Sequence, residues 1–216
     1  LNQNISIKRL HEMRSYGGKI LTHGLKEEIL KKFISHDHNL RSAIESAYEN
    51  FLVLQKEKPD FLIQTEKEQI KLAQQNIVNF YANENVNPYV AISAMGPWIV
   101  TLKGAVIYDC GGYGMLGLGH SPKLALNEIK KSHVMANVMT PSLSQMDFID
   151  ILKKEIGHSR KNKSTFTEFC CLNSGSESVS IGARLADVNA KELTAKGAKH
   201  HGKTIARLTL SGSFHG

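Results

Sequence analysis

The sequence predicts an α/β protein in which a mostly helical region, residues 1–95, precedes a parallel-type sheet covered by helices in residues 96–216. Two observations carry this prediction. Only three of the 17 glycines fall in the first region, as expected where helices rather than tight turns dominate. Near the C-terminus, an apolar run at 166–172, a helical pattern at 177–196 and a strand-like run at 203–211 follow one another, which is typical of a parallel sheet.

The first region contains two well-marked helices after a weaker helical segment at 1–35. Asn39 is expected to cap a helix that ends near Lys58, because Pro59 cannot continue it. Thr65 and Glu68 have capping-box spacing and predict the start of a second helix. The side chains expected to face the interior are Ile44, Tyr48, Phe51 and Leu52 in the first helix, and Ile70, Ala73, Ile77 and Phe80 or Tyr81 in the second.

The second region begins with strands and turns. Two β-rich runs, 98–102 and 105–109, are separated by Lys103-Gly104 and predict a hairpin, after which a glycine-dense loop occupies 111–120. Helices are expected at about 121–132 and 144–156, before the strand–helix–strand unit.

Composition excludes several classes of protein. No apolar run approaches the ~20 residues of a membrane-spanning helix, and the first residues lack the layout of a signal peptide. The three cysteines, Cys110, Cys170 and Cys171, are too few and too badly spaced for a zinc cluster, so we expect no metal site. The adjacent pair is interpreted as small apolar residues of a buried strand, which suits a reducing, cytoplasmic setting.

The net charge of +7 is distributed unevenly. Residues 1–95 carry +1 and residues 96–216 carry +6, an excess that suits an anionic small ligand or nucleic acid. The densest basic run, 153–163, has no interleaved aromatic side chain and is interpreted as solvated surface. We therefore expect an anionic small molecule and no nucleic-acid partner.

Two loops follow the predicted strands of the strand–helix–strand unit, at the sheet edge where ligands of such folds bind. In the first, Ser174, Gly175 and Ser176 open a helix, so backbone N–H groups, hydroxyls and the helix dipole could hold an anion. An ordinary capped helix start explains these residues equally well. The second loop carries Phe214 and His215, whose aromatic face would suit stacking on a flat ring.

Residues 97–216 resemble the first part of a class III pyridoxal-phosphate-dependent aminotransferase of fold type I. The matching stretches are AVIYD at 105–109 with the loop to His120, NSGSESVSIGARLA at 173–186, and SFHG at 213–216. Each is weak alone, whereas the three in this order are specific. Residues 1–95 lie outside the resemblance and form a helical N-terminal extension.

The resemblance implies a fold, a cofactor and a reaction. Residues 96–216 would be the incomplete start of the large domain, and Ser174, Gly175 and Ser176 would hold the cofactor phosphate. Phe214 would stack on the pyridine ring, His215 would shape that loop, and Tyr113 would line the substrate pocket. The family transfers an amino group from a primary amine or amino acid to a 2-oxo acid, and works as a homodimer.

The same resemblance leaves the catalytic residues unknown. In the family, the Schiff-base lysine and the acid that pairs with the pyridine nitrogen lie downstream of the Phe-His-Gly loop, so we expect this chain to be an N-terminal part that cannot transaminate alone. Two other readings stay open: another fold-type-I reaction (aminomutase, decarboxylase or racemase), or a non-catalytic interaction protein derived from the fold.

Overall fold

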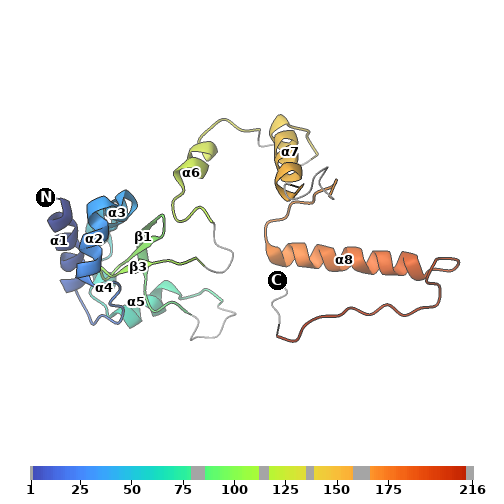
Figure 1. Cartoon of the computed structure of the whole chain (residues 1–216). Coiled ribbons are helices and arrows are strands. Elements are labelled where there is room, and N and C mark those ends of the chain that lie inside the picture. Colours follow the sequence, from blue (N-terminus) through green and yellow to red (C-terminus); the bar gives the residue numbers. More distant parts are fainter. Residues whose placement is uncertain (1, 79–85, 112–116, 135–138, 158–165, 213–216) are drawn as a thin grey trace. The chain divides into compact units, whose positions relative to one another are not determined.

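The computed structural model describes residues 2–78, 86–111, 117–134, 139–157 and 166–212 (Figure 1). The chain divides into two compact units, Leu1–His133 and Val134–Gly216. In order, the first contains α1 (Asn2–Ser15), α2 (Glu27–His36), α3 (His38–Glu57), α4 (Pro59–Leu62), α5 (Glu66–Ala73), β1 (Ala91–Met95), β2 (Trp98–Thr101), β3 (Val106–Tyr108) and α6 (Lys123–Ile129). The second contains α7 (Leu143–Gly157) and α8 (Gly175–Thr194).

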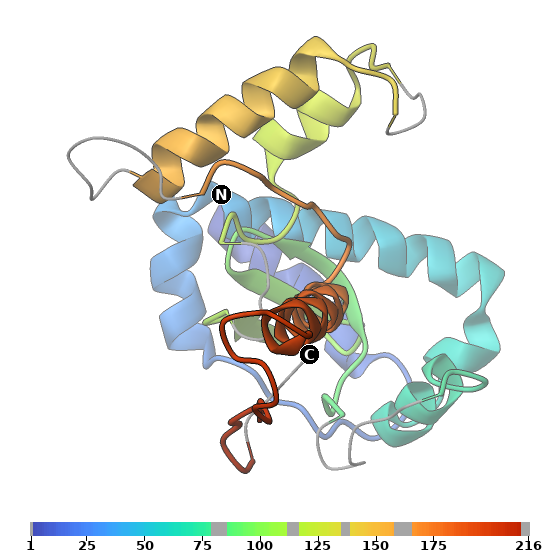
Figure 2. The same cartoon turned by 90° about the vertical axis from the view of Figure 1, so that its right-hand side faces the viewer.

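Helices and sheet of the first unit share one hydrophobic core. Helix α3 lies against β1 and β2, and α1 packs beside α3 (Figures 1 and 2). The buried side chains of this core include Leu10 and Met13 from α1, Ile34 from α2, Leu40, Ile44, Ala47 and Phe51 from α3, and Trp98, Val100 and Val106 from the strands. The predicted helix at 39–58 and the inward position of Ile44 and Phe51 are thus confirmed.

The sheet has three antiparallel strands in the order β1-β2-β3. Trp98 lies opposite Met95 in β1 and opposite Tyr108 in β3, so it occupies the middle of the sheet. The predicted hairpin is confirmed, and Gly104 at its turn has a φ of +68°. β1 was not predicted. β1 and β2 lie on either side of residue 95 and pair with each other, so the chain is packed continuously where its glycine content changes. The assignment of 1–95 and 96–216 to separate domains stays a prediction.

Asp37, not the expected Asn39, caps α3. Its backbone is extended, with a φ of −93°, and its Oδ1 accepts a hydrogen bond from the Leu40 amide at 3.1 Å. Its Oδ2 accepts from the indole Nε1 of Trp98 at 2.8 Å, which joins the helix start to the sheet. Asn39 lies inside the first turn, and its amide lies beside Gly96, where a Cβ would come within 2.8 Å of Nδ2. The prediction was wrong by two residues, because aspartate is as good an N-cap as asparagine and Asp37 comes first in the chain.

The capping box at Thr65 and Glu68 is confirmed, but α5 is shorter than predicted and turns a polar face inward. Glu66 and Gln69 are buried, whereas Ala73 and Ile77 are exposed. Glu66 Oε2 accepts hydrogen bonds from the backbone amides of Leu21 and Thr22 at 2.6 and 2.7 Å. The buried face of α5 therefore contacts main-chain N–H groups through a carboxylate. Phe80 and Tyr81 lie outside the described residues.

Lys103 is a buried lysine at the β2–β3 turn. Its Nζ donates hydrogen bonds to the carbonyl oxygens of Leu62 at 3.1 Å and Tyr16 at 3.3 Å. Burial lowers the pKa of Lys103, and the nearby carboxylate of Glu66 acts in the opposite direction. These contacts make Lys103 a structural residue that ties the turn to two helix ends.

In the second unit, the two helices agree with the sequence and the two strands do not. The segments 166–172 and 203–211 carry no strand in the part of the chain that the structure describes, so the predicted parallel sheet is not observed. The apolar patterns of these two segments favour a strand, but a strand forms only when a neighbouring strand completes its hydrogen bonds. Cys170 and Cys171 are therefore exposed free thiols and not buried strand residues.

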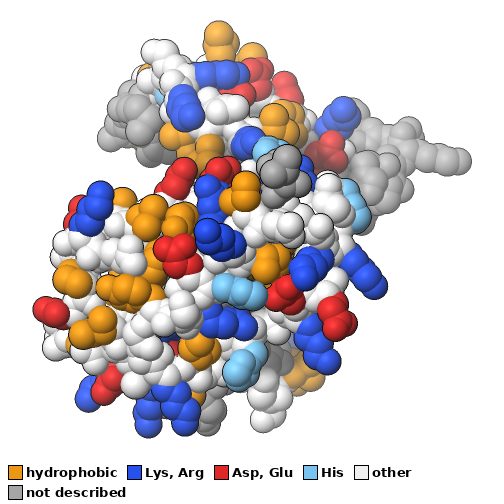
Figure 3. All heavy atoms as spheres, turned by 90° about the vertical axis from the view of Figure 1, so that its left-hand side faces the viewer, with side chains coloured by type: hydrophobic (Ala, Val, Ile, Leu, Met, Phe, Trp, Pro, Cys, Tyr) orange, Lys and Arg blue, Asp and Glu red, His pale blue; other side chains and the backbone are white. Residues whose placement is uncertain are grey.

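The surface mixes charges of both signs. On the face that Figure 3 shows, Lys and Arg side chains lie among Asp and Glu side chains. No helix in the described ranges combines the length and apolar character that crossing a bilayer requires.

Candidate functional site

The candidate anion site is the N-terminus of α8, which begins at Gly175. Ser174 is its N-cap: the backbone is extended, and Oγ accepts a hydrogen bond from the Glu177 amide at 3.2 Å. The Glu177 carboxylate reaches back and accepts from the Asn173 amide at 2.8 Å. Ser174 thus supports the first turn of the helix, and its expected role as a ligand of the phosphate stays a prediction.

Gly175 and Ser176 provide the donors that remain. As the first two residues of the helix, their amides have no intrahelical partner, and no other partner among the described residues. A Cβ at Gly175 would meet nothing within 4 Å, so no neighbouring group crowds this position at the helix start. Two amides, one hydroxyl and the positive end of a 20-residue helix form a donor set that suits a phosphate group.

Glu177 is the residue at this helix start that the sequence reasoning missed. The Ser-x-x-Glu spacing of Ser174 and Glu177 is the same capping signal that was recognised at Thr65. Its carboxylate places one negative charge near the helix N-terminus, so a bound anion has to be held by the amides of Gly175 and Ser176 against that charge.

Three expected site residues, Tyr113, Phe214 and His215, lie outside the described residues. Gly212, the last described residue of the second loop, has a φ of +76° and lies in a turn. The structure thus brings Ser174, Gly175 and Ser176 together, and their proximity to the aromatic residues stays a prediction.

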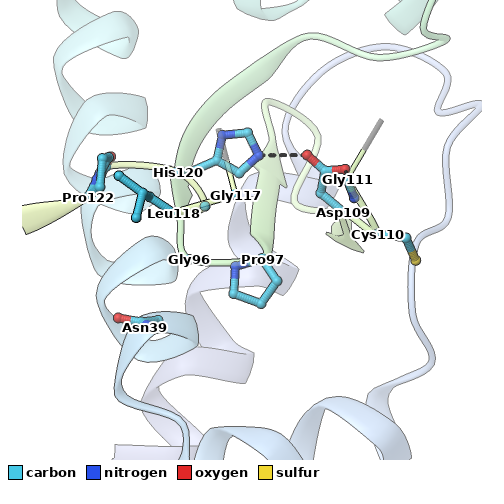
Figure 4. A pocket seen from close by; sticks show the side chains of 12 residues that line it. Asn39, Gly96, Pro97, Asp109, Cys110, Gly111, Gly117, Leu118, His120 and Pro122 are labelled. Atoms are coloured by element: carbon cyan, nitrogen blue, oxygen red, sulfur yellow. Dashed lines mark hydrogen bonds and ion pairs between the residues drawn. The ribbon is translucent and has the colours of Figure 1, made fainter. Parts of the chain in front are cut away.

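A second constellation lies in the first unit, at the end of β3. The Asp109 carboxylate and the His120 imidazole pair at 2.8 Å between Oδ2 and Nε2 (Figure 4). They line a cavity of about 600 Å³ together with Asn39, Gly96, Pro97 and the residues from Cys110 to Gly111 and from Gly117 to Pro122. In Figure 4 the Cys110 sulfur points away from His120, so the three do not form a nucleophile–base–acid arrangement.

Hydrogen bonds keep the Asp109 carboxylate ionised. The Gly111 amide donates to Oδ1 at 2.9 Å, and this bond, followed by the bond with His120, holds the pKa of Asp109 below its usual range. An ionised carboxylate favours the His120 tautomer that carries its proton on Nε2. Sequence reasoning missed this pair because the two residues lie on opposite sides of the glycine-dense loop; the signal available was an acid directly after a strand and a histidine directly after the last glycine.

Metal binding has no candidate group: among the described residues, no three His, Cys, Asp or Glu side chains lie together as ligands. Comparison of the chain with models of protein families, with curated proteins and with solved structures found no match.

Proposed function

We propose that this chain is the N-terminal part of a pyridoxal-phosphate-dependent aminotransferase similar to class III, which transfers an amino group from a primary amine or amino acid to a 2-oxo acid. The proposal includes a cytoplasmic homodimer. It is supported by the three matching sequence stretches and by one observation, the open donor set at the N-terminus of α8.

The residues at this helix start fit the phosphate of the cofactor. A phosphate needs several N–H or O–H donors and close approach to the backbone, and Gly175 and Ser176 offer both. A side chain at position 175 would project into the space that is open in the structure. The Glu177 carboxylate is already satisfied by the Asn173 amide, so it does not occupy the amides of the first turn.

The residues of this chain would bind and orient the cofactor. The proton transfer at the amine carbon would fall to the lysine that the resemblance places downstream. Gly175 and Ser176 bind the phosphate, and Ser174 keeps the first turn in place through Glu177. By the resemblance, Phe214 holds the ring plane and Tyr113 lines the substrate pocket. When bound, the cofactor supplies delocalisation of the negative charge that develops at the amine carbon.

A matched pair of substitutions in α8 tests the phosphate site. Gly175→Val blocks the approach to the first amides and should weaken pyridoxal phosphate binding by about 1.5–3 kcal/mol, the worth of a charge-assisted hydrogen bond. Gly182→Val, in the exposed middle of the same helix, should leave it unchanged, because its Cβ also meets nothing within 4 Å but lies away from the N-terminus. Calorimetric titration of the longer protein, extended past Gly216, measures both. Equal affinity in the two variants would place the phosphate elsewhere.

Phe214 gives a second, independent test. Phe214→Ala should weaken cofactor binding by roughly 0.5–1.5 kcal/mol beyond the loss of buried area, and Phe214→Tyr should be nearly silent, because both rings stack. Equal damage from both substitutions would mean a packed position with no room for a hydroxyl.

The same proposal predicts that residues 1–216 alone transfer no amino group. Incubation with pyridoxal phosphate, borohydride reduction and mass spectrometry should find no single, saturable lysine adduct. One stoichiometric adduct together with turnover of an amine would overturn the placement of the catalytic lysine beyond this chain.

A further inference from the structure

A hollow of about 320 Å³ lies in the first unit, where the start of α3 packs beside α1. It is lined by residues of these two helices only: Ile5, Ser6 and Arg9 on α1, and His38, Arg41, Ser42 and Glu45 on α3. The α3 residues are spaced i, i+3, i+4 and i+7, so they share one side of that helix. The hollow therefore lies in the helical region 1–95, outside the stretch that resembles an aminotransferase.

Arg41 is held in place by the end of α2. Its Nη1 donates to the Ile34 carbonyl oxygen at 2.7 Å, and this is the single hydrogen bond of its side chain among the described residues. The residue is half-buried. A guanidinium carries several N–H donors in one plane, so one such bond orients the plane and leaves the other donors for a ligand.

Arg9 is oriented by two other side chains. Its guanidinium lies over the Tyr48 ring, 5.3 Å from the ring centroid, and Nη1 lies 3.4 Å from Oε1 of Glu45. A charge-assisted N–H···O bond is usually about 2.7–2.9 Å long, so the ion pair with Glu45 is loose. The Glu45 side chain is also 59% exposed, and water screens such a pair. An anion with better geometry can therefore take over the donors of Arg9.

The other polar groups of the hollow add hydrogen-bonding capacity without adding negative charge. Ser6 is buried, and the Ser42 hydroxyl lies 3.4 Å from Nδ1 of His38. With the imidazole neutral, the lining side chains carry a net charge of +1. The carboxylate of Asp37 accepts from the Leu40 amide, so the donors at this end of α3 are side chains rather than free main-chain amides.

We propose that this hollow binds a phosphate monoester of a small molecule, with the phosphate group between Arg9 and Arg41. A carboxylate has two oxygens, which one guanidinium saturates. The three terminal oxygens of a phosphate monoester accept from two guanidinium groups and a hydroxyl together. The exposed side chain of Ile5 provides an apolar wall for the organic part of the ligand. Ligand pockets span about 300–1,000 Å³, so this volume suits a small molecule. The inference goes beyond the proposed function and does not depend on it.

Phenyl phosphate and benzoate are matched probes, because they share a ring and differ in the anionic group. The whole chain is titrated with each at one ionic strength, and binding is followed by calorimetry and by NMR of the Nε–H signals of Arg9 and Arg41. Phenyl phosphate should shift both signals saturably and bind at least about fivefold more tightly than benzoate. Equal affinity for the two probes, or no shift at the two arginines, would overturn the proposal.

Three variants separate a built site from diffuse attraction. Arg9→Gln should weaken phenyl phosphate binding at least about tenfold, as expected for losing a charge-assisted contact. Lys8→Gln removes the same charge from the neighbouring exposed position, which does not line the hollow, and should change the affinity by less than about twofold. Glu45→Gln should tighten binding about two- to fivefold, because it removes the carboxylate that competes for Arg9.

Unchanged Trp98 fluorescence confirms folding in each variant, and the titration of the wild-type chain stands by itself if a variant does not fold. Equal losses in Arg9→Gln and Lys8→Gln would mean that no site holds the phosphate. Weaker binding in Glu45→Gln would mean that the ligand uses the carboxylate and is not an anion. Either result would overturn the proposal.

The N-terminus of α8 is a second place where the probe can bind, and the same titration tells the two apart. Gly175→Val should leave the shifts of Arg9 and Arg41 unchanged, and Arg9→Gln should leave any shift of the Ser176 amide unchanged. A probe that shifts the Ser176 amide alone would overturn the site at α1 and α3 and leave the proposed function standing. Shifts at the two arginines alone would support this site and count against the phosphate site at α8.

A lipid headgroup carries the same phosphate monoester, so a vesicle arm distinguishes the source. The chain should not co-sediment with phosphatidylcholine vesicles that contain phosphatidic acid. Co-sedimentation that Arg9→Gln abolishes, in a chain whose arginine signals free phenyl phosphate does not shift, would overturn the small-molecule assignment.

Discussion

Replacing Asp37 with alanine should destabilise the first unit through two separate hydrogen bonds. One carboxylate oxygen accepts from the Leu40 amide and the other from the Trp98 indole. Loss of the helix cap costs about 1 kcal/mol. Trp98 is buried, with 1% of its surface exposed, so its indole N–H would lose its partner without gaining water. Leaving a buried donor unsatisfied costs about 1–3 kcal/mol.

We therefore expect Asp37→Ala to lower the free energy of unfolding by about 2–4 kcal/mol. Asp37→Asn should lower it by less, because asparagine is an equally good N-cap but has only one oxygen acceptor. Asn39→Ala, two residues along, should stay within about 0.5 kcal/mol of wild type, since that side chain is exposed and does not cap the helix.

Urea unfolding followed by tryptophan fluorescence measures all three variants. Trp98 is the one tryptophan of the sequence, so the signal reports directly on the strand that Asp37 contacts. An Asp37→Asn variant as stable as wild type would show that the indole bond contributes nothing, and equal losses in Asp37→Ala and Asp37→Asn would show that the cap contributes nothing; either result would refute the reasoning.

Three further predictions concern the same unit. Gly104→Ala should cost more than about 2 kcal/mol in urea unfolding, because φ is +68° and the new Cβ would lie 2.5 Å from the Leu10 carbonyl oxygen, whereas Gly117→Ala, with nothing within 4 Å, should be nearly neutral. Burial lowers the pKa of Lys103, so the unfolded chain binds that proton more tightly and stability should rise as pH increases toward the ordinary lysine range; unfolding of Lys103→Met against pH should lack this rise. The pKa of Asp109 is lowered, so its contribution is complete above the ordinary aspartate range and is lost as pH falls through the lower folded value; an acid unfolding curve of Asp109→Asn should lack that step.

Elements fixed by local signals were predictable. The capping box at Thr65, the stop at Pro59, the Gly104 turn and the apolar spacing of α3 and α8 act over a few residues, and the corresponding helices and hairpin occur in the structure. The predicted limit differs at α5, which ends at Ala73 and does not continue through 74–78.

Part of the candidate site was predictable for the same reason. Ser174, Gly175 and Ser176 do lie together at a helix start, because a cap and the residues that follow it are adjacent in sequence. The pairing of Asp109 with His120 was not, because it requires the β1–β2 turn to bring two loop ends together across the cavity.

The sequence by itself determined the capping box at Thr65, the end of α3 before Pro59, the β2–β3 hairpin, and which residues could donate to an anion at α8. The tertiary structure decided what pairs with what: β1 joins the hairpin, Asp37 reaches Trp98, Glu66 turns inward to the main chain, and the runs at 166–172 and 203–211 lack ladder partners in the described part of the chain. The physical reason is the range of the interactions. A cap or a turn is satisfied by neighbours in sequence, whereas a strand, a buried carboxylate or an indole N–H is satisfied only by groups that folding brings to it.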